Sequence, residues 1–600
     1  MLYGIEQNVL QSPFSLAVSL ILSLGVINIG TFVQKIILKN LKADSLNFNI
    51  FFSPIIGIYF LLFPLYLCLI FEFYATYFIK FVSYLLIFLG VYQIFKSKSA
   101  IQELKKNFQK TNTFFLIIFL FLLLFLISAS PVTHADSLDY HFLGSLNLIN
   151  FGHFQKEILP MHSNLISIGE IIISLGLVLK AEQFGAIMQM LSLLSIIPLF
   201  KNKNSFLLLI LACPITFFLV SSPKPQLIFC ISTFLIFVYL NNFSNKITKE
   251  QLKKIFPIIV FILSINSLVK YSFLLSSSLL GIYLMFLMYR NKLIIYSVII
   301  VFVITLFTFI PYWIFRFENF ETNIFDLIRS PLPINIYGYE KFHDLLKGGS
   351  ISIINVFFPK NLQTFSTTYG PLVLLFPFFV KKEIFKFKIE IFIIMVFFIN
   401  VLIFGSNLPR FLFEGFLWLT YLVSKNTKLE SNFFKIFRKS VYIQVLIMII
   451  IYSYFVLTIF PASIFETLKP KVLSKTVNGY ELSEWVNKKL DKKDVLLSTH
   501  RSISLYKNKT YSNLYARQID TKNKKSNIYF NFLKKEKVNK ILFYGNKLDK
   551  DIYKNCLGKL LYFKDNVGRH VGRNPFNKKK LYDGWIFEFN YKKLPGCIVR

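Results

Sequence analysis

The sequence predicts a polytopic α-helical membrane protein of about fourteen spans, followed by a small C-terminal α/β domain. Hydrophobic residues make up 54% of the 600-residue chain and charged residues only 16%, whereas about a quarter of the residues of a soluble protein are charged. The mean hydropathy is +0.56. The charges gather between long apolar runs, and the run 112–130 carries none over a length that crosses about 30 Å of hydrocarbon.

The expected spans are apolar runs separated by polar or basic loops. They lie near 14–33, 50–70, 74–95, 112–130, 183–200, 205–221, 225–241, 255–269, 272–289, 293–311, 368–380, 389–406, 411–424 and 440–460. The N-terminus lacks the basic segment that begins a cleavable signal peptide. We therefore expect the first apolar run to remain in the protein as a span.

Basic residues fall in alternate loops, and the positive-inside rule places such loops in the cytoplasm. These loops are 35–42, 96–110, 201–203, 246–254, 290–292, 381–388 and 425–439. The N-terminus and the tail 462–600 then lie outside. Residues 164–180 are apolar enough to span, but counting them would move the later basic loops outside. We expect them to form a helix that lies at the external interface.

The loops divide the chain into three parts. Residues 1–111 form three additional N-terminal spans, and residues 112–461 form the main transmembrane core. Two long loops of this core, 131–182 and 312–367, lie on the outer side, where functional residues concentrate in loops of such length. Residues 462–600 form a separate extracytoplasmic domain.

The tail alternates helical and strand patterns, which is typical of a small α/β unit. An amphipathic stretch at 481–490 predicts a helix, and 494–498 and 540–545 read as strands. No Gly-rich phosphate motif accompanies these strands, so nucleotide binding is not predicted.

Five cysteines divide into two groups. Cys68, Cys213 and Cys230 fall in expected spans, where they serve packing. Cys556 and Cys597 fall outside the membrane in an oxidising compartment, and a disulfide between them is our hypothesis. The Cys and His spacing of a metal site is absent from the sequence.

The net charge of +36 does not indicate nucleic-acid binding. Much of it lies in short loops beside spans, where lysine and arginine set topology. The rest lies in the tail, where anionic lipid headgroups are the expected neighbour. Membrane lipids are therefore expected partners and nucleic acids are not.

The segment His134–His141 places two carboxylates and two imidazoles where the span 112–130 meets the outer surface. On a helix, Asp136 and Tyr140 share a face, and we expect Asp139 to point elsewhere. Beside hydrocarbon, a carboxylate gains proton affinity unless a cation or hydrogen bond holds it ionised. Asp136 is therefore a candidate general base or binding group. The alternative is a helix N-cap with ordinary loop polarity.

This arrangement resembles the GT-C glycosyltransferases. The shared features are an outward span, Asp136 and Tyr140 four residues apart, Gly152 after an apolar helix, and the expected interfacial helix. The similarity is to the branch that uses polyprenyl-phosphate sugars, such as the protein O-mannosyltransferases and the aminoarabinose transferases of lipid A. In that class an Asp at the start of the first external loop is catalytic, and Asp136 matches it. Ser137 stands where a second acid is common, and Asp139 is a candidate to compensate.

Further matches lie at the outer ends of other spans. Arg410 resembles the Arg-aromatic element of those enzymes, where it implies a clamp on the carrier phosphate. Lys224 and Lys270 are candidates to converge with it, and snorkelling to lipid headgroups is the alternative for each lysine. Tyr140, His141 and His162 are expected to help bind the substrate. Glu157 and His343 are further outer-loop candidates.

The resemblance implies an inverting transfer of a sugar from a polyprenyl-phosphate carrier to an extracytoplasmic acceptor, at a bacterial inner membrane. No cofactor is predicted, although Asp136, Asp139 and His141 leave a divalent cation open. A lipid or polysaccharide transporter is the rival, and a transporter typically places charges or broken helices near the bilayer midplane. A catalytically inactive relative is a third alternative, because the second acid is missing.

Overall fold

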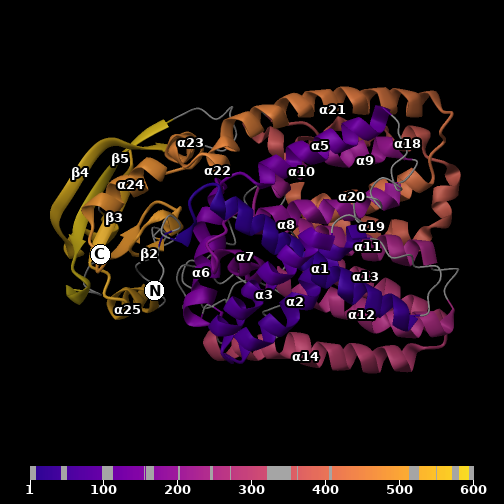
Figure 1. The fold of residues 1–600 in the computed structure, drawn as a ribbon, viewed down its shortest axis with the longest axis horizontal. Helices are drawn as coiled ribbons and strands as arrows, with labels where there is room; N and C mark the ends of the chain where they lie inside the picture. The colour runs from indigo at the N-terminus through magenta and orange to yellow at the C-terminus, as the bar shows by residue number, and fades with distance from the viewer. Residues whose placement is uncertain are drawn as a thin grey trace.

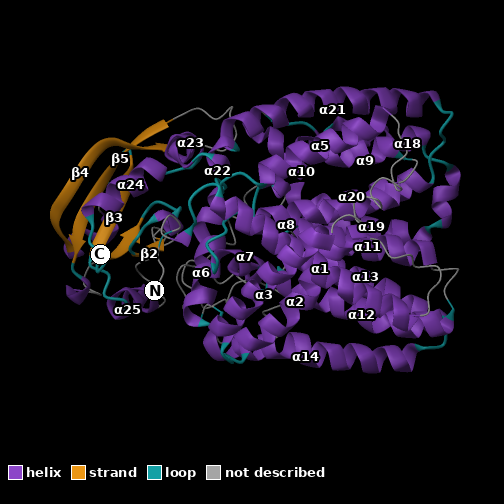
Figure 2. Ribbon diagram, in the orientation of Figure 1, coloured by secondary structure: helices purple, strands orange, loops and turns teal. Residues whose placement is uncertain are grey.

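The computed structural model is mostly helical, and a five-stranded sheet lies near the C-terminus (Figure 2). Most helices run side by side along the long axis of the molecule, and the sheet lies at one end of them (Figure 1). The structure describes residues 4, 8–41, 50–96, 112–154, 156, 168–200, 203–243, 248–270, 272–320, 353–360, 362–404, 409–512, 526–546, 548, 551–570 and 580–593.

Seven helices among these residues are long and apolar enough to cross a membrane. They are α1 (Phe14–Leu41), α2 (Ser53–Ile70), α3 (Ala75–Lys96), α12 (Lys249–Val269), α13 (Ser272–Arg290), α14 (Ile294–Phe320) and α21 (Asn432–Ile459). Shorter apolar helices include α5 (Asn112–Ser128), α11 (Leu227–Phe243), α19 (Lys388–Phe404) and α20 (Phe413–Lys425). The helices are those of a membrane-embedded protein, as predicted. They do not establish the predicted count of about fourteen spans.

Three of the expected spans are not single α-helices. The run 183–200 is α8 (Phe184–Ser192) followed by a 3₁₀ segment, and 205–221 divides into α9 (Asn204–Leu211) and α10 (Pro214–Val220). The run 368–380 contains a 3₁₀ turn and then the four-residue helix α18 (Phe376–Phe379). Proline causes the break after α9, because Pro214 has no amide hydrogen and holds Cys213 in an extended conformation.

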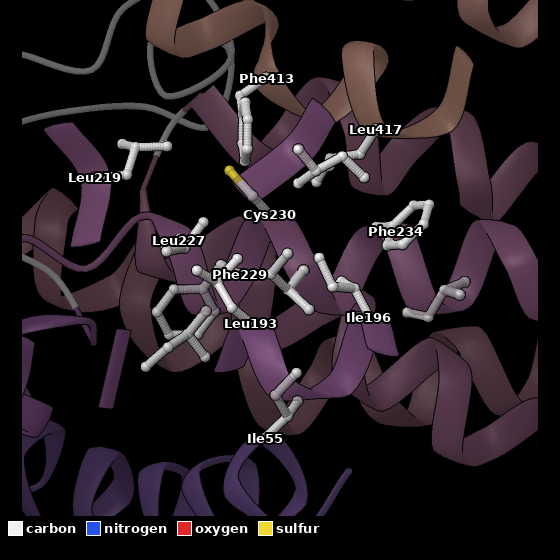
Figure 3. Packing of buried hydrophobic residues seen from close by; sticks show 14 of the residues in the cluster. Ile55, Leu193, Ile196, Leu219, Leu227, Phe229, Cys230, Phe234, Phe413 and Leu417 are labelled. Carbon is white, nitrogen blue, oxygen red and sulfur yellow. The ribbon is translucent and has the colours of Figure 1, made fainter. Parts of the chain in front are cut away.

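Helix α11 lies at the centre of the helical part. Phe229, Cys230 and Phe234 of α11 face apolar side chains from several sides (Figure 3). These neighbours include Ile55 of α2, Leu193 and Ile196 after α8, and Phe413 and Leu417 of α20. Because α11 is apolar all round, it is stable only when other helices surround it. It therefore gives the residues at its N-terminal end a rigid support.

The segment after α5 forms short buried helices. A single π-helical turn, η3 (Ser137–His141), leads into α6 (Phe142–Phe151), which ends at Gly152 in the left-handed conformation. Within the predicted helix at 164–180 lies the shorter helix α7 (Glu170–Leu177), all of whose residues are buried, and its position at the membrane interface stays a prediction. At eight residues, α7 is too short to span a bilayer.

The tail folds as a five-stranded sheet in the order β2-β1-β3-β5-β4. Strands β1 (Val495–Ser498) and β3 (Lys540–Gly545) were predicted, and they pair in parallel. The strands β2 (Lys509–Ser512), β4 (Leu557–His570) and β5 (Lys580–Phe589) were not predicted. The β3–β5 and β4–β5 pairs are antiparallel.

Helices cover both faces of the sheet. Trp485 of α24 (Tyr480–Lys489) packs with Leu542, whereas Leu533 of α25 (Ser526–Lys535) packs with Ile541 on the other face. This division follows from the alternation of side chains along a strand. The predicted α/β unit and its amphipathic helix at 481–490 are confirmed.

The structure describes four of the five cysteines, and it tests part of what the sequence predicted for them. Cys68, Cys213 and Cys230 are free, whereas Cys556 is disulfide-bonded. Its predicted partner, Cys597, lies outside the described residues. A disulfide at Cys556 is consistent with the predicted oxidising surroundings of the tail.

The sheet domain is tied to the helical part by polar contacts. Lys469 of α23 (Lys469–Thr476) pairs with Glu182 at 3.0 Å, and the Ser504 hydroxyl donates to the carbonyl oxygen of Leu138 in η3. The amide of Ser12, before α1, donates to Glu466 at 2.6 Å. The end of the helical part that carries η3 therefore lies against the sheet domain.

Candidate functional site

The candidate site lies where η3 meets the sheet domain, and Asp136 is at its centre. Helix α5 ends at Ser128, shortly before Pro131, because the residue that precedes a proline disfavours helical geometry. The chain then turns into the helix that carries Asp136 and η3. π-helical turns occur frequently at functional sites. The Asp136 side chain makes no N-cap hydrogen bond, so the interpretation of this residue as a simple helix cap is wrong.

Three cations contact the Asp136 carboxylate. Lys224 Nζ lies 2.5 Å and Arg410 Nη1 lies 3.2 Å from Oδ2, and Arg501 Nη2 lies 2.8 Å from Oδ1. Lys224 and Arg410 were predicted to converge, and both contact Asp136. Arg501 belongs to the sheet domain and was not predicted. One carboxylate therefore links three segments that are far apart in the sequence.

The expectation that Asp139 points away from Asp136 is wrong. Arg501 Nε lies 3.2 Å from Asp139 Oδ2 while its Nη2 contacts Asp136, so a single guanidinium bridges both carboxylates. Residues three apart on a helix are neighbours on its surface, which explains the pairing. Ser137, at the position of the missing second acid, instead hydrogen-bonds to Ser222 at 2.9 Å. Asp139 thus supplies a second acid at the site.

Lys224 is held in the turn between α10 and α11 and is only 1% exposed. Two prolines flank it, and they pack against glycines: a Cβ on Gly169 would lie 2.6 Å from Pro225, and one on Gly185 would lie 2.9 Å from Pro223. The close approach brings the turn beside α7 and α8. Because its ammonium pairs with Asp136, snorkelling to headgroups does not describe Lys224.

Arg410 and Lys270 share an aromatic neighbour. The Arg410 guanidinium lies 5.1 Å and the Lys270 ammonium 5.5 Å from the centre of the Phe411 ring. Such cation–π contacts hold cations in place without neutralising them. The Arg410 Nε is buried and has no hydrogen-bond partner among the described residues. Lys270, at the end of α12, therefore joins the cluster as predicted, although it makes no ion pair within the described part of the chain.

The charges of the cluster shift its pKa values. Burial opposes ionisation of Asp136, but Lys224, His134, Arg410 and Arg501 together hold its pKa well below the usual range. Burial and the neighbouring Arg410 lower the pKa of Lys224 to about 8, even though Asp136 opposes this shift. Burial, Lys224 and Arg410 also lower the pKa of Lys270. The cations are crowded enough to repel one another, which favours the binding of a further anion.

A buried pair lies beside this cluster. His141 Nδ1 donates to Glu170 Oε1 of α7 at 2.7 Å, and each side chain is only 3% exposed. The Tyr140 ring lies 4.2 Å from the His141 ring. Burial, followed by the charges of Lys224 and Lys270, lowers the pKa of His141 well below its ordinary value. The predicted candidates His162, Glu157 and His343 lie outside the described residues.

The structure thus brings Asp136, Asp139, Tyr140, His141, Lys224, Lys270 and Arg410 together and adds Arg501 and Glu170. The sequence contains a feature that could have identified Arg501 as a site residue. Arg501 follows the predicted strand 494–498, and functional residues often follow the carboxyl ends of parallel strands. Glu170 has a weaker signal, a lone acid in an apolar run. In the described part of the chain, His, Cys, Asp and Glu side chains form no group of three placed to hold a metal ion.

Gly479 lies against His500, which precedes the site residue Arg501 in the sheet domain. Its replacement therefore tests how the sheet domain holds Arg501. The φ of Gly479 is +76°, and a Cβ there would lie 2.2 Å from the ring of His500, the neighbour of Arg501. We expect Gly479→Ala to cost about 1–3 kcal/mol and to lower the midpoint of thermal unfolding. Gly281→Ala is the control, because no atom lies within 4 Å of its added Cβ. Equal midpoints for the two variants would contradict this expectation.

Two family models match the chain, and together they include every residue of the site. Residues 91–478 match the family model described as the DUF1420 N-terminal domain, and residues 474–599 match the DUF1420 C-terminal domain. The two matches meet where α23 ends. Asp136, Lys224, Lys270 and Arg410 fall in the first match, and Arg501 falls in the second. No curated protein matches the chain.

Proposed function

We propose that this chain, which belongs to the DUF1420 family, is a membrane glycosyltransferase that takes a sugar from a polyprenyl-phosphate carrier. The observation that carries this proposal is the clustering of Lys224, Arg410 and Arg501 on Asp136, at one end of a bundle of apolar helices. A lipid-linked phosphate sugar needs a cationic phosphate site beside hydrocarbon, and it needs a carboxylate near that site. The cluster supplies both.

In the proposed reaction, an acceptor hydroxyl attacks the anomeric carbon as the bond from that carbon to the phosphate oxygen breaks. The phosphate leaves with the bonding electron pair, and Arg410, Lys224 and Lys270 stabilise its charge. Attack from the face opposite the phosphate inverts the anomeric centre. Asp136 orients the hydroxyl, and it also holds the cations in place until the donor phosphate shares them.

The proposed placement is a bacterial inner membrane with the sheet domain on the outer side. The basic loops 96–110 and 425–439 support a cytoplasmic location for the opposite end of the bundle. The disulfide at Cys556 supports an oxidising compartment for the sheet domain. The acceptor is then an extracytoplasmic glycan, lipid or protein. Membrane lipids surround the helices.

The test is release of the carrier by the purified chain in lipid nanodiscs. Polyprenyl-phosphate sugars are supplied with extracts of cell-envelope acceptors, and free polyprenyl phosphate is quantified. Release that depends on protein and acceptor supports the glycosyltransferase. Binding of the donor without release in any mixture would overturn the proposal in favour of the rival transporter or an inactive relative.

The affinity of the cluster for a phosphate monoester is expected to fall as the pH rises above about 8. Lys224, whose folded pKa is lowered to about 8, is charged below this pH and neutral above it, and Lys270 adds to the same trend. The second pKa of a phosphate monoester is about 6, so the ligand keeps its charge. Calorimetric titration with geranyl phosphate from pH 7 to 9.5 measures this dependence, and loss of one proton weakens binding about tenfold per pH unit.

Lys224→Gln is the matched variant for this titration. It should bind geranyl phosphate more weakly at pH 7 and should show a flatter dependence on pH. An affinity of the wild type that stays constant up to pH 9.5 would contradict the assignment of Lys224 to the phosphate.

A further inference from the structure

The site contains an acid–base pair that the proposed reaction does not yet use. Glu170 accepts a hydrogen bond from His141 Nδ1, which leaves the second ring nitrogen, Nε2, with its lone pair. Nε2 is buried and has no hydrogen-bond partner among the described residues. A buried acceptor without a hydrogen bond costs about 1–3 kcal/mol. Nε2 therefore keeps an acceptor position that no described residue uses.

Asp136 is poorly suited to accept the proton of the acceptor hydroxyl. Its carboxylate is shared among Lys224, Arg410 and Arg501, and each of these contacts stabilises the ionised form. A carboxylate held ionised in this way has little affinity for a proton, whereas general base catalysis requires such affinity. The reaction therefore needs a different group to take the proton.

We propose that His141 is the general base of the transfer and that Glu170 is its positioning residue. This inference rests on the proposed function. The hydroxyl proton passes to His141 Nε2, the hydroxyl oxygen bonds to the anomeric carbon, and the carrier phosphate leaves with its electron pair. Glu170 fixes the tautomer with Nδ1 protonated and stabilises the imidazolium that forms, the same division of roles as in a nucleophile–His–carboxylate arrangement.

The charges around His141 fit this role. The groups that act on it are Glu170 of α7, Lys224 of the α10–α11 turn, Lys270 at the end of α12, and Asp136, His134 and Tyr140 of its own segment. Burial, Lys224 and Lys270 all disfavour the imidazolium, so His141 is neutral before the donor binds. When a donor phosphate neutralises the two lysines, that opposition weakens and the proton affinity of His141 rises.

The test compares wild type with His141→Gln and Glu170→Gln in nanodiscs that contain a polyprenyl-phosphate sugar. Ethanol and trifluoroethanol serve as simple acceptors, and release of polyprenyl phosphate is measured. His141→Gln should lose about 10²–10³-fold with ethanol. Its loss should be much smaller with trifluoroethanol, because a more acidic hydroxyl needs less help from a base. Ser174→Ala is the control, since Ser174 hydrogen-bonds across the same α6–α7 contact without a titratable group.

Glu170→Gln provides a second, independent readout. The neutral amide no longer supports the imidazolium, so the low-pH limb of the release rate should move to lower pH and the plateau should fall. The ratio of release with trifluoroethanol to release with ethanol is compared in both variants, because a folding defect lowers the two rates equally. Equal losses with the two alcohols and an unmoved pH limb would overturn the role of His141 while leaving the glycosyltransferase intact. Absence of release by wild type with every acceptor would instead overturn the proposed function itself and this inference with it.

Discussion

Replacing Asp136 with asparagine is expected to abolish sugar transfer while strengthening the binding of the carrier phosphate. The amide has nearly the shape of the carboxylate, but it carries no charge to orient the acceptor or to hold three cations together. We expect the rate of carrier release to fall about 10²–10³-fold, the usual cost of removing a positioned polar group from a catalytic site. Measurement of release under single-turnover conditions separates this loss from any change in product dissociation.

The opposite change in binding distinguishes this prediction from simple damage. In the wild type, Asp136 competes with the donor phosphate for Lys224, Arg410 and Arg501. Without that competitor, geranyl phosphate should bind about tenfold more tightly, which corresponds to about 1.4 kcal/mol. Asp494→Asn is the matched control, because Asp494 pairs with Lys540 in the sheet domain, 3.7 Å away. Wild-type release by Asp136→Asn would show that Asp136 has no part in the chemistry.

The sequence predicts those parts of this protein that depend on composition and local spacing. Long runs such as 14–33 and 112–130 appear as helices. Their length and apolar composition are those of a segment that crosses a bilayer, so the sequence alone predicts them. The helices that break, at Cys213–Pro214 and near Pro198, contain the signal for their breaks in the prolines themselves. Hydropathy windows ignore that signal, which is why these runs were expected to be continuous spans.

The long β4–β5 pair was missed for a different reason. Its residues include several lysines and glycines, and exposed residues such as Lys559 and Lys564 interrupt the apolar alternation of a strand. The pair also packs against β3 and α24, which are distant in sequence. Local propensity is a weak guide where packing with remote elements decides the structure.

For the site, too, the sequence predicts which residues lie near a span, but it does not predict the contacts between distant segments. Asp136, Lys224, Lys270 and Arg410 each lie next to an expected span, so topology alone places them on one side. The pairing of Asp139 and the contribution of Arg501 depend on how the sheet domain docks, and no local pattern encodes that docking. The His141–Glu170 pair depends on the packing of α6 on α7, across a stretch that includes residues outside the described part of the chain.

Arg501 gives the strongest test of whether the sheet domain is part of the site. It bridges Asp136 and Asp139 with two different nitrogens of one guanidinium. Arg501→Ala would leave two neighbouring carboxylates without their shared cation, and the repulsion between them would act against the positions that they hold. Because displaced carboxylates neither orient the hydroxyl nor hold Lys224 and Arg410, we expect carrier release to fall about 10²–10³-fold.

Arg501→Lys should recover only a small part of this loss. A lysine ammonium is a point charge on a flexible stem, whereas the planar guanidinium presents separate N–H donors in a fixed geometry. Lys540→Met is the control, since it removes one positive charge from the same domain at an ion pair that lies outside the cluster. If Arg501→Ala releases the carrier at the wild-type rate, the sheet domain only covers the helical part. If Arg501→Ala is impaired and Lys540→Met is not, the catalytic centre is shared between the two parts of the chain.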